Sequence, residues 1–471
     1  MALDFTLIAF GFVVISLIVT FLLKKFAKAD TYFIISLLKT QKPLAFFDKM
    51  ARHKKFLDIF SMVGLLIGFG ALSADFFYGR KLPIAKRLGL FVLSFTILCA
   101  GLVGIDSLLG NALSQSSLIG GLFPLMVFSF GAMGLAGFTL FSLVLQAFEI
   151  TSNYLLGLKS CPGVAPLIPG VQIPGVPITP PLHAWISLLI ILLVHEGAHG
   201  IVGRRQGFTI KSTGVVLLGF LPVGAFVEPD EKQVREEKEE KVLPFLAAGP
   251  MANLALMGIT GVILALSLGL ITPVTDYLYP GVQDNLVLGV GVGSVLENTL
   301  FCGQQYPSSA FGQMQEGDII RSVNGAEIKN AQDLFSALQQ DRFSQKTFAL
   351  ERTGKLVTIN LTPNELGQFG FVPQQIRNEN FPLPESFSLY ATIATLFVDF
   401  IYWLFLLNFL VASINFLPMH PFDGGRIAKL MIAPYLNFLN KPKEELQKIV
   451  EKFFLYIILA LLLVNALPLF I

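Results

Sequence analysis

Long runs of apolar residues alternate with short polar segments along this chain. A helix that crosses a bilayer needs about 20 mostly apolar residues, and eight runs approach or exceed that length. They lie near residues 5–23, 56–77, 88–109, 118–148, 182–203, 246–272, 388–417 and 453–470. This pattern predicts a polytopic α-helical membrane protein with about eight spans. The fourth run suits either one long tilted helix or two short helices broken around residues 131–137, and we favour one helix.

The region 280–365 has a different pattern, because short β-branched and apolar runs alternate there with turn signals. Asn324-Gly325 is a turn sequence, and residues 331–339 have helical periodicity. The strand-like runs are 287–295, 319–323, 347–351 and 357–361. A domain of about 85 residues can bury its own core. We therefore expect one small inserted α/β domain between the sixth and seventh spans.

Three connecting segments also have a distinct composition. Residues 161–181 are rich in Pro and Gly and predict an extended linker. Residues 208–227 alternate small, apolar and β-branched side chains, which favours a short sheet or a re-entrant hairpin at the membrane face. Residues 228–241 are highly charged and predict a solvated surface segment.

The composition agrees with a membrane protein. Apolar residues make up 54% of the 471 residues and charged residues only 14%, and the mean hydropathy is +0.67. The basic residues are spread over short loops rather than clustered with aromatic residues, so no nucleic-acid partner is expected. Cys99, Cys161 and Cys302 are too few and too widely spaced to predict a disulfide framework, although Cys302 can be paired or reactive.

The distribution of basic residues predicts the orientation, because Lys and Arg concentrate in cytoplasmic loops. The first run lacks a cleavage site and reads as an uncleaved anchor, followed by a basic loop at residues 24–55. This places the N-terminus outside, segments 204–245 and 418–452 in the cytoplasm, and segment 273–387 outside. Four basic residues in the loop between the second and third runs, which this count places outside, disagree. They are Arg80, Lys81, Lys86 and Arg87.

The fifth apolar run contains His195-Glu196-Gly197-Ala198-His199. Residues i and i+4 share one face of a helix, so His195 and His199 can bind one metal ion together. In metallopeptidases with this motif, the Glu takes a proton from metal-activated water and later delivers it to the leaving amine. Ionisable side chains at bilayer depth are costly and mark functional sites. We therefore predict one zinc ion at His195 and His199, with Glu196 as the general base and acid.

Tetrahedral zinc needs a further protein ligand, and Asp423 is the strongest candidate. It lies in Asn415-Phe416-Leu417-Pro418-Met419-His420-Pro421-Phe422-Asp423-Gly424, where Pro and Gly interrupt the chain directly after the seventh run. Irregular backbone at that depth is tolerated only inside protein or around a water-filled cavity.

These motifs together resemble the site-2 protease family of intramembrane metalloproteases. The resemblance covers about residues 180–430 and includes HExxH, Gly249-Pro250-Met251-Ala252-Asn253, the run 316–325 (EGDIIRSVNG), and NxxPxxxxDG, in the family's order. It implies that His195, His199 and Asp423 bind zinc, that Glu196 is catalytic, and that the inserted domain is PDZ-like. The family commonly has Pro where this chain has His420. That His420 is either a tolerated substitution, an additional metal ligand, or a hydrogen-bond partner of Asp423.

The resemblance divides the chain into six parts. They are N-terminal transmembrane helices (1–150), a Pro/Gly-rich external linker (151–181), the first half of a protease core (182–275), a PDZ-like domain (280–365), the second half of the core (386–430), and a cytoplasmic segment with a last span (431–471). Asn415 and Asn253 are candidates for stabilising an oxyanion or positioning the substrate, or for packing between helices. We expect Asp399 to pair with a neighbouring helix.

The predicted function is cleavage of transmembrane segments of other proteins near the cytoplasmic face, in a multi-pass protein of the cell membrane. The partners are then a transmembrane substrate, lipid, and a peptide or C-terminus at the PDZ-like domain. Two alternatives remain. A prenyl-protein-processing type of protease would bind zinc through a downstream Glu, and a non-enzymatic scaffold or transporter would carry structural zinc.

Overall fold

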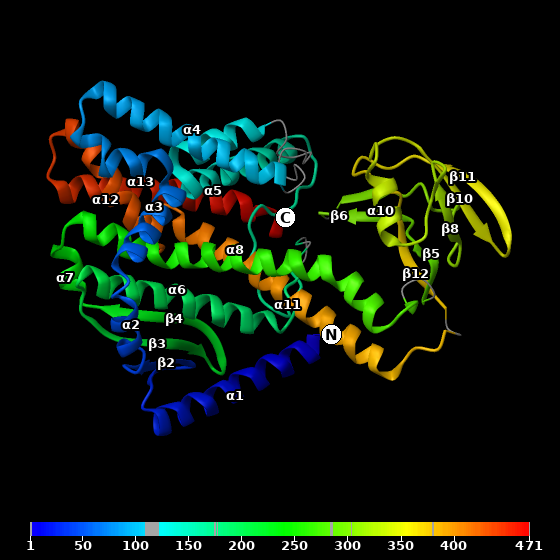
Figure 1. Ribbon diagram of the computed structural model, residues 1–471, viewed down its shortest axis with the longest axis horizontal. Coiled ribbons are helices and arrows are strands. Elements are labelled where there is room, and N and C mark those ends of the chain that lie inside the picture. Colours follow the sequence, from blue (N-terminus) through cyan, green and yellow to red (C-terminus); the bar gives the residue numbers. More distant parts are fainter. Residues whose placement is uncertain are drawn as a thin grey trace.

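The computed structural model describes residues 2–108, 122–173, 176, 178–282, 286–302, 304–378 and 381–470. Its long helices form one body, and a smaller β-rich module lies beside one end of it (Figure 1). Among these residues, eight helices are long and apolar enough to cross a membrane, which confirms the predicted class of a polytopic helical protein. They are α1 (Ala2–Ala27), α3 (Lys54–Phe77), α4 (Ile84–Leu108), α5 (Phe123–Leu155), α6 (Ala184–Gln206), α8 (Glu239–Leu278), α11 (Glu385–Phe416) and α13 (Lys443–Ala466).

The centre of the helical body is formed by α6, α8 and α11, which run side by side (Figure 1). Ile191, Leu243, Ala247 and Phe416 are fully buried there. Three short helices lie at the end of the body away from the β-rich module: α2 (Leu44–Met50), α7 (Glu231–Glu236) and α12 (Asp423–Ile432). Since α12 follows α11 after a break at residues 417–422, the chain can place Asp423 beside α6.

A four-stranded antiparallel sheet lies at the same end of the body. β3 (Ile210–Leu218) and β4 (Leu221–Pro229) form the hairpin expected at 208–227. β1 (Asp30–Tyr32) and β2 (Ile35–Thr40), which the sequence pattern did not reveal, extend the sheet in the order β1-β2-β3-β4. β4 is therefore an edge strand, and it packs against α6.

The β-rich module confirms an inserted small domain between α8 and α11. Its main sheet has the order β11-β10-β8-β5-β12, with β9 paired to β8, and a separate hairpin joins β6 and β7. The sheet continues beyond the predicted limit at residue 365, because β12 pairs with β5. The strands are β5 (Val287–Val295), β6 (Asn298–Phe301), β7 (Gln304–Pro307), β8 (Ile319–Val323), β9 (Ala326–Glu327), β10 (Lys346–Arg352), β11 (Lys355–Leu361) and β12 (Phe371–Arg377), and helix α10 (Ala331–Gln339) lies between β9 and β10 in the chain.

The module has an apolar core that includes Ile320 and Phe348, and the buried carboxylate of Asp318 is held by an ion pair. Arg352 donates from Nε and Nη2 to the two carboxylate oxygens of Asp318, at 2.7 and 2.6 Å. Burial alone would raise the pKa of the Asp318 carboxyl, but Arg352 and the Gln315 backbone N–H hold that pKa below its ordinary value. Asp318 is thus an ionised, fully paired side chain in the module.

Helix α3 begins and ends on the same side of the helical body. Near its start, Asp58 accepts a bond of 2.6 Å from Arg205 at the end of α6. Just past its end, Lys81 lies 3.2 Å from Glu240 at the start of α8. The end of α6 and the start of α8 are joined by the β3–β4 hairpin and α7, so they lie on one face. The expectation that the loop around Lys81 lies on the opposite side from segment 204–245 is therefore wrong.

Helix α5 also begins and ends on one side of the helical body, the side nearest the β-rich module. Its first turns pack on the second half of α4, where Cys99 donates to the Val127 carbonyl, and its second half packs on the end of α13, where Asn465 donates to the Leu143 carbonyl. Both α3 and α5 contain non-helical residues, Phe69–Gly70 and Met133–Gly134. The fourth apolar run is thus two helical pieces rather than the single helix that we favoured. Apolar length alone does not distinguish a crossing helix from one that turns back.

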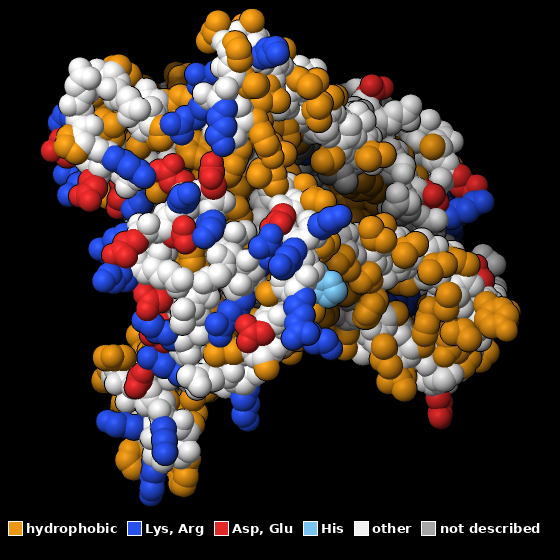
Figure 2. Space-filling view, turned by 60° about the vertical axis from the view of Figure 1, so that its left-hand side comes forward, with side chains coloured by type: hydrophobic (Ala, Val, Ile, Leu, Met, Phe, Trp, Pro, Cys, Tyr) orange, Lys and Arg blue, Asp and Glu red, His pale blue; other side chains and the backbone are white. Residues whose placement is uncertain are grey.

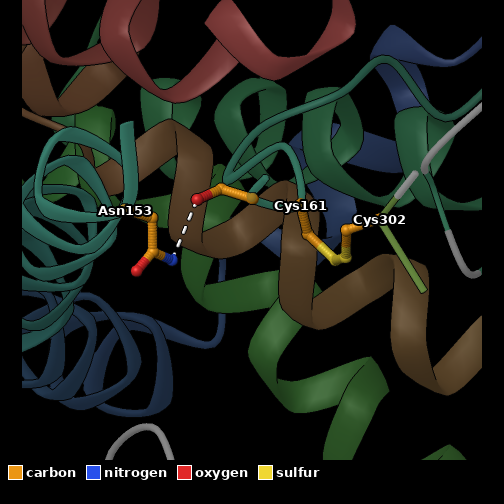
Figure 3. Close-up of a disulfide and its surroundings, with 4 residues drawn as sticks. Asn153, Cys161 and Cys302 are labelled. Carbon is orange, nitrogen blue, oxygen red and sulfur yellow. Dashed lines mark hydrogen bonds between the residues drawn. A yellow bond between two sulfur atoms is a disulfide. The ribbon is translucent and has the colours of Figure 1, made fainter. Parts of the chain in front are cut away.

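A disulfide joins the linker to the β-rich module, which the sparse cysteine set did not predict. Cys161 follows α5 and bonds to Cys302 in the β6–β7 hairpin, 141 positions later, with a Cα–Cα distance of 4.6 Å. Asn153 at the end of α5 donates to Ser160 at 3.0 Å and fixes the preceding turn (Figure 3). The two cysteines come together only through the tertiary fold, so spacing could not identify them.

Charged side chains gather on the face that carries α2, α7 and α12, whereas apolar side chains cover much of the flanks (Figure 2). Ion pairs cross this face between segments far apart in the sequence. Besides Arg205–Asp58 and Lys81–Glu240, they include Arg204–Asp48, Lys429–Glu451 and Lys443–Glu239. We call this surface the charged face.

Candidate metal centre

His195, His199 and Asp423 come together inside the helical body, as the sequence predicted. Among the described residues, they form the one group of His, Cys, Asp or Glu whose ligand atoms converge, all within 4.8 Å of one another. Asp423 Oδ2 lies 3.3 Å from His195 Nε2 and 3.1 Å from His199 Nε2. Both imidazoles are buried, at 5% and 7% exposure. Two nitrogens and one carboxylate oxygen are a donor set that holds a divalent metal and leaves positions for water and substrate.

Helix geometry and local contacts orient His199. His195 and His199 are one turn apart on α6, and their Nε2 atoms lie 3.2 Å from each other. The other nitrogen of His199, Nδ1, lies 2.8 Å from the Phe245 carbonyl and donates to it. This bond fixes the tautomer in which the Nε2 lone pair points to the centre.

Asn253 orients His195 in the same way. Its amide lies 3.0 Å from His195 Nδ1 and is fully buried, and its Oδ1 has no hydrogen-bond partner among the described residues. Exchanging the two ends of the amide, which differ little in shape, brings Oδ1 to Nδ1–H. That orientation pairs Oδ1 with Nδ1–H and leaves the lone pair of His195 Nε2 free to bind a metal ion. Asn253 therefore orients one of the two converging imidazoles, a contact that neither of its two predicted roles included.

Gly249 provides the space for an ion between these ligands. A Cβ at this position would lie 2.6 Å from His195 Nε2 and still closer to His199 Nε2. The backbone of α8 can approach both imidazoles only because residue 249 has no side chain. The converging donors and the open position at Gly249 fit a metal ion. The close approach of Gly249 to the imidazoles could have been predicted from sequence, because Gly249 lies one helical turn after Phe245 and one turn before Asn253.

Asp423 is presented by a tightly packed loop. It is the first residue of α12, where the helix dipole favours a negative charge. A Cβ at Gly424 would overlap the Phe416 carbonyl, and a Cβ at Gly425 would lie 2.6 Å from the His420 backbone nitrogen. The two glycines after Asp423 thus let the loop at residues 416–420 fold against the start of α12. This loop, together with Asp423, is called the Asp423 loop below.

Glu196 projects from the same turn of α6 toward the edge strand β4. Its Oε2 accepts a hydrogen bond of 2.9 Å from the Val227 backbone N–H. Successive residues of a strand direct their backbone groups to alternate sides. Val227 N–H therefore points away from β3, and the free edge of β4 lies beside the predicted catalytic carboxylate.

The other residues predicted at or near the site contribute no atom to this group of metal-binding side chains. His420 is exposed and is not in the donor group. Asn415 is partly buried, and its side-chain amide donates to the Val411 carbonyl of its own helix at 2.9 Å. Asp399 pairs with His183 at 3.2 Å, which confirms its expected contact with a neighbouring helix.

We expect Asn253→Ala to weaken metal binding by about 10- to 100-fold, because the replaced group orients a ligand. Asn253→Asp keeps an oxygen acceptor for His195 Nδ1–H and should retain most of the affinity. Competition with a chromogenic chelator measures both. Unchanged affinity in Asn253→Ala would show that His195 is oriented without this contact.

Comparison with known proteins adds independent information. Residues 183–465, more than half of the chain, match the sequence model of Peptidase family M50. The chain is also 29% identical, over 267 residues, to an uncharacterized protein of Methanocaldococcus jannaschii. That alignment covers 56% of this chain and 57% of the relative, so the chain spans little more than half the length of the curated protein that it matches. The family match includes the whole metal centre.

Proposed function

Because this chain belongs to Peptidase family M50, the membrane metallopeptidases of the site-2 protease type, we propose that it is a zinc endopeptidase that cuts transmembrane segments of other proteins. The convergence of His195, His199 and Asp423 beside Glu196 carries the proposal. A prenyl-protein-processing protease would require a Glu as the third ligand, whereas the third converging donor here is Asp423.

Three side chains would hold zinc, and a fourth would move the proton. Bound at His195, His199 and Asp423, zinc would supply Lewis acidity and lower the pKa of a water molecule to about 7. Glu196 takes the proton from the attacking water and returns it to the leaving amine. The hydrogen bond from Val227 N–H keeps the Glu196 carboxylate facing β4.

The edge strand β4 offers a way to bind the substrate in an extended form. The backbone of a transmembrane helix is hydrogen-bonded internally, so the helix must unwind locally before its peptide bond is accessible. β4 is paired only on its β3 side, and its free edge can pair with an unwound segment by β-strand addition. Val227 places this edge beside Glu196, so a segment bound there would run past the catalytic carboxylate.

Charge and cysteine chemistry support one orientation. Lys81 lies on the charged face with Arg204 and Arg205, and Arg80 is next to it in the chain. Two of the four residues that contradicted the sequence-based count therefore agree with a cytoplasmic charged face. The Cys161–Cys302 disulfide supports an oxidising compartment for the β-rich module. We therefore place the module outside the cell membrane and the metal centre near the cytoplasmic face.

We further propose that the β-rich module is PDZ-like and binds an extended peptide or a C-terminus. β12 is an edge strand of the main sheet, and α10 lies beside it. Between them is a cavity of about 420 Å³, lined by Leu296, Phe335, Leu338 and Phe371 among others. An apolar groove beside an edge strand suits strand addition with one anchored side chain. Binding of apolar C-terminal peptides to the full chain, measured against Phe335→Lys, tests this role; equal binding by both proteins would contradict it.

Cleavage by the reconstituted protein tests the function. A single-span membrane protein is presented in vesicles, and the products are identified by mass spectrometry. We expect cuts within the span, toward its cytoplasmic end, that stop after zinc is removed with a chelator and resume when zinc is restored. Cutting that continues in metal-free protein, or that is confined to loops outside the membrane, would contradict the proposal.

A further inference from the structure

Helices α3 and α5 are interrupted by the same backbone conformation. Phe69 and Gly70 have φ/ψ of −128°/15° and 58°/−148°, and Met133 and Gly134 have −127°/19° and 57°/−147°. The second conformation of each pair is accessible almost exclusively to glycine. Two interruptions with matching dihedral angles indicate one kind of turn, used twice.

Each turn folds its helix back on itself. Ser73 Oγ donates at 2.7 Å to the carbonyl of Leu65, eight residues earlier. In α5, a Cβ at Gly137 would overlap the carbonyl of Ser129, also eight residues earlier. Such residues are ~12 Å apart along an uninterrupted helix. The turn in α3 therefore returns the chain to the charged face, and the turn in α5 returns the chain to the side of the β-rich module.

The two turns contact each other inside the helical body. A Cβ at Gly70 would lie 2.6 Å from the backbone nitrogen of Gly134, and a Cβ at Gly134 would overlap the Ile67 carbonyl. Neither glycine can carry a side chain without separating the turns. We call this contact the interlock.

The α3 side of the interlock also touches the Asp423 loop. Phe69 packs edge-on against Phe416, with ring centroids 6.4 Å apart, and a Cβ at Gly68 would overlap the Phe416 ring. Phe416 is fully buried, and its carbonyl packs against Gly424, next to the metal ligand Asp423. Displacing α3 would therefore displace the loop that presents Asp423.

The first half of α3 touches the other wall of the metal centre. A Cβ at Gly64 would lie 2.7 Å from Met251 Cβ and 3.3 Å from the Ala247 carbonyl. These two residues flank Gly249, whose backbone faces both imidazoles. One helix thus contacts both α8 and the Asp423 loop.

We propose that the interlock of α3 with α5 positions the metal ligands, so that Gly68, Gly70 and Gly134 act through the spacing of α8 and the Asp423 loop. The inference rests on the proposed function, because it assigns these residues to that metal centre. It gives the N-terminal helices a role in the reaction beyond anchoring. None of the three glycines touches a ligand, and each acts through packing alone.

Gly134→Ala tests this, with Gly101→Ala in α4 as the matched control, because a Cβ at Gly101 would meet nothing within 4 Å. Zinc affinity of the purified full chain is measured by chelator competition, and folding by thermal unfolding. We expect zinc binding about tenfold weaker in Gly134→Ala, within the range seen when ligand-orienting groups are lost, and wild-type binding in Gly101→Ala. Wild-type affinity in a folded Gly134→Ala protein would overturn the proposal.

A second pair decides the question even if Gly134→Ala does not fold. Gly68→Ala should also weaken zinc binding, and adding Phe416→Leu should restore part of it, because the smaller side chain makes room for the new methyl group. No loss in Gly68→Ala, or no restoration in the double variant, would overturn the proposal. Zinc affinity is read separately from cleavage, so a wild-type protein that binds zinc but cuts nothing contradicts only the proposed function.

Discussion

Replacing Glu196 by Gln is expected to slow cleavage by about 10²- to 10⁴-fold, the usual contribution of a general base, with no change in metal affinity. Gln has nearly the same size as Glu, and its amide oxygen can still accept the bond from Val227 N–H that Glu196 accepts at 2.9 Å. The contact with β4 therefore persists. What the variant loses is the ability to take a proton from water and return it to the leaving amine.

The experiment compares Glu196→Gln with Glu231→Gln. Glu231 is an exposed residue of α7 on the charged face. Initial rates are measured on a membrane-anchored substrate at saturating zinc, and bound zinc is measured in the same samples. The control should cut at the wild-type rate. A Glu196→Gln protein that retains the wild-type rate would show that another group transfers the proton.

Local sequence patterns explain why the three converging side chains could be predicted. The spacing of His195 and His199 requires only one helical turn, which local geometry fixes. Asp423 is 224 residues beyond His199, yet it was identifiable because a break of Pro and Gly at membrane depth is unusual. In both cases, a local sequence pattern was enough to identify the residues.

The interlock and the disulfide were not predictable in this way. The apolar run of α3 has the length of a crossing helix, and hydropathy contains no term for a turn at Gly70. The basic residues after α3 did contain the signal, since Arg80 and Lys81 contradicted the orientation that assumed a complete crossing. Cys161 and Cys302 meet only after the β-rich module has been placed beside the end of α5. Long-range packing, rather than local preference, determines both features.

The residues of α8 that contact the two imidazoles could be predicted only in part. Phe245, Gly249 and Asn253 are spaced by one turn each on α8, so they share the face toward α6. The sequence placed Asn253 near the site. It could not show that the Asn253 amide faces His195, because that depends on the depth at which α6 crosses α8.

Gly249→Ala is expected to reduce metal affinity by at least about 100-fold, at the upper end of what changes around metal ligands cause, and to abolish cleavage. The added Cβ would lie 2.6 Å from His195 Nε2 and closer to His199 Nε2, where the two lone pairs converge. The helix cannot move away freely, because the Phe245 carbonyl and Asn253 on the same helix hold the other nitrogens of the two imidazoles.

Gly258→Ala is the matched control for this change, because it lies on the same helix and a Cβ there would meet nothing within 4 Å. Zinc content and affinity of both variants are measured on purified, folded protein, together with cleavage. The control should bind and cut as the wild type does, whereas Gly249→Ala should contain no zinc after dialysis. Zinc retained at wild-type affinity in Gly249→Ala would mean that the ion is not held on the side of the imidazoles that faces α8, and the arrangement of ligands proposed for this centre would then be wrong.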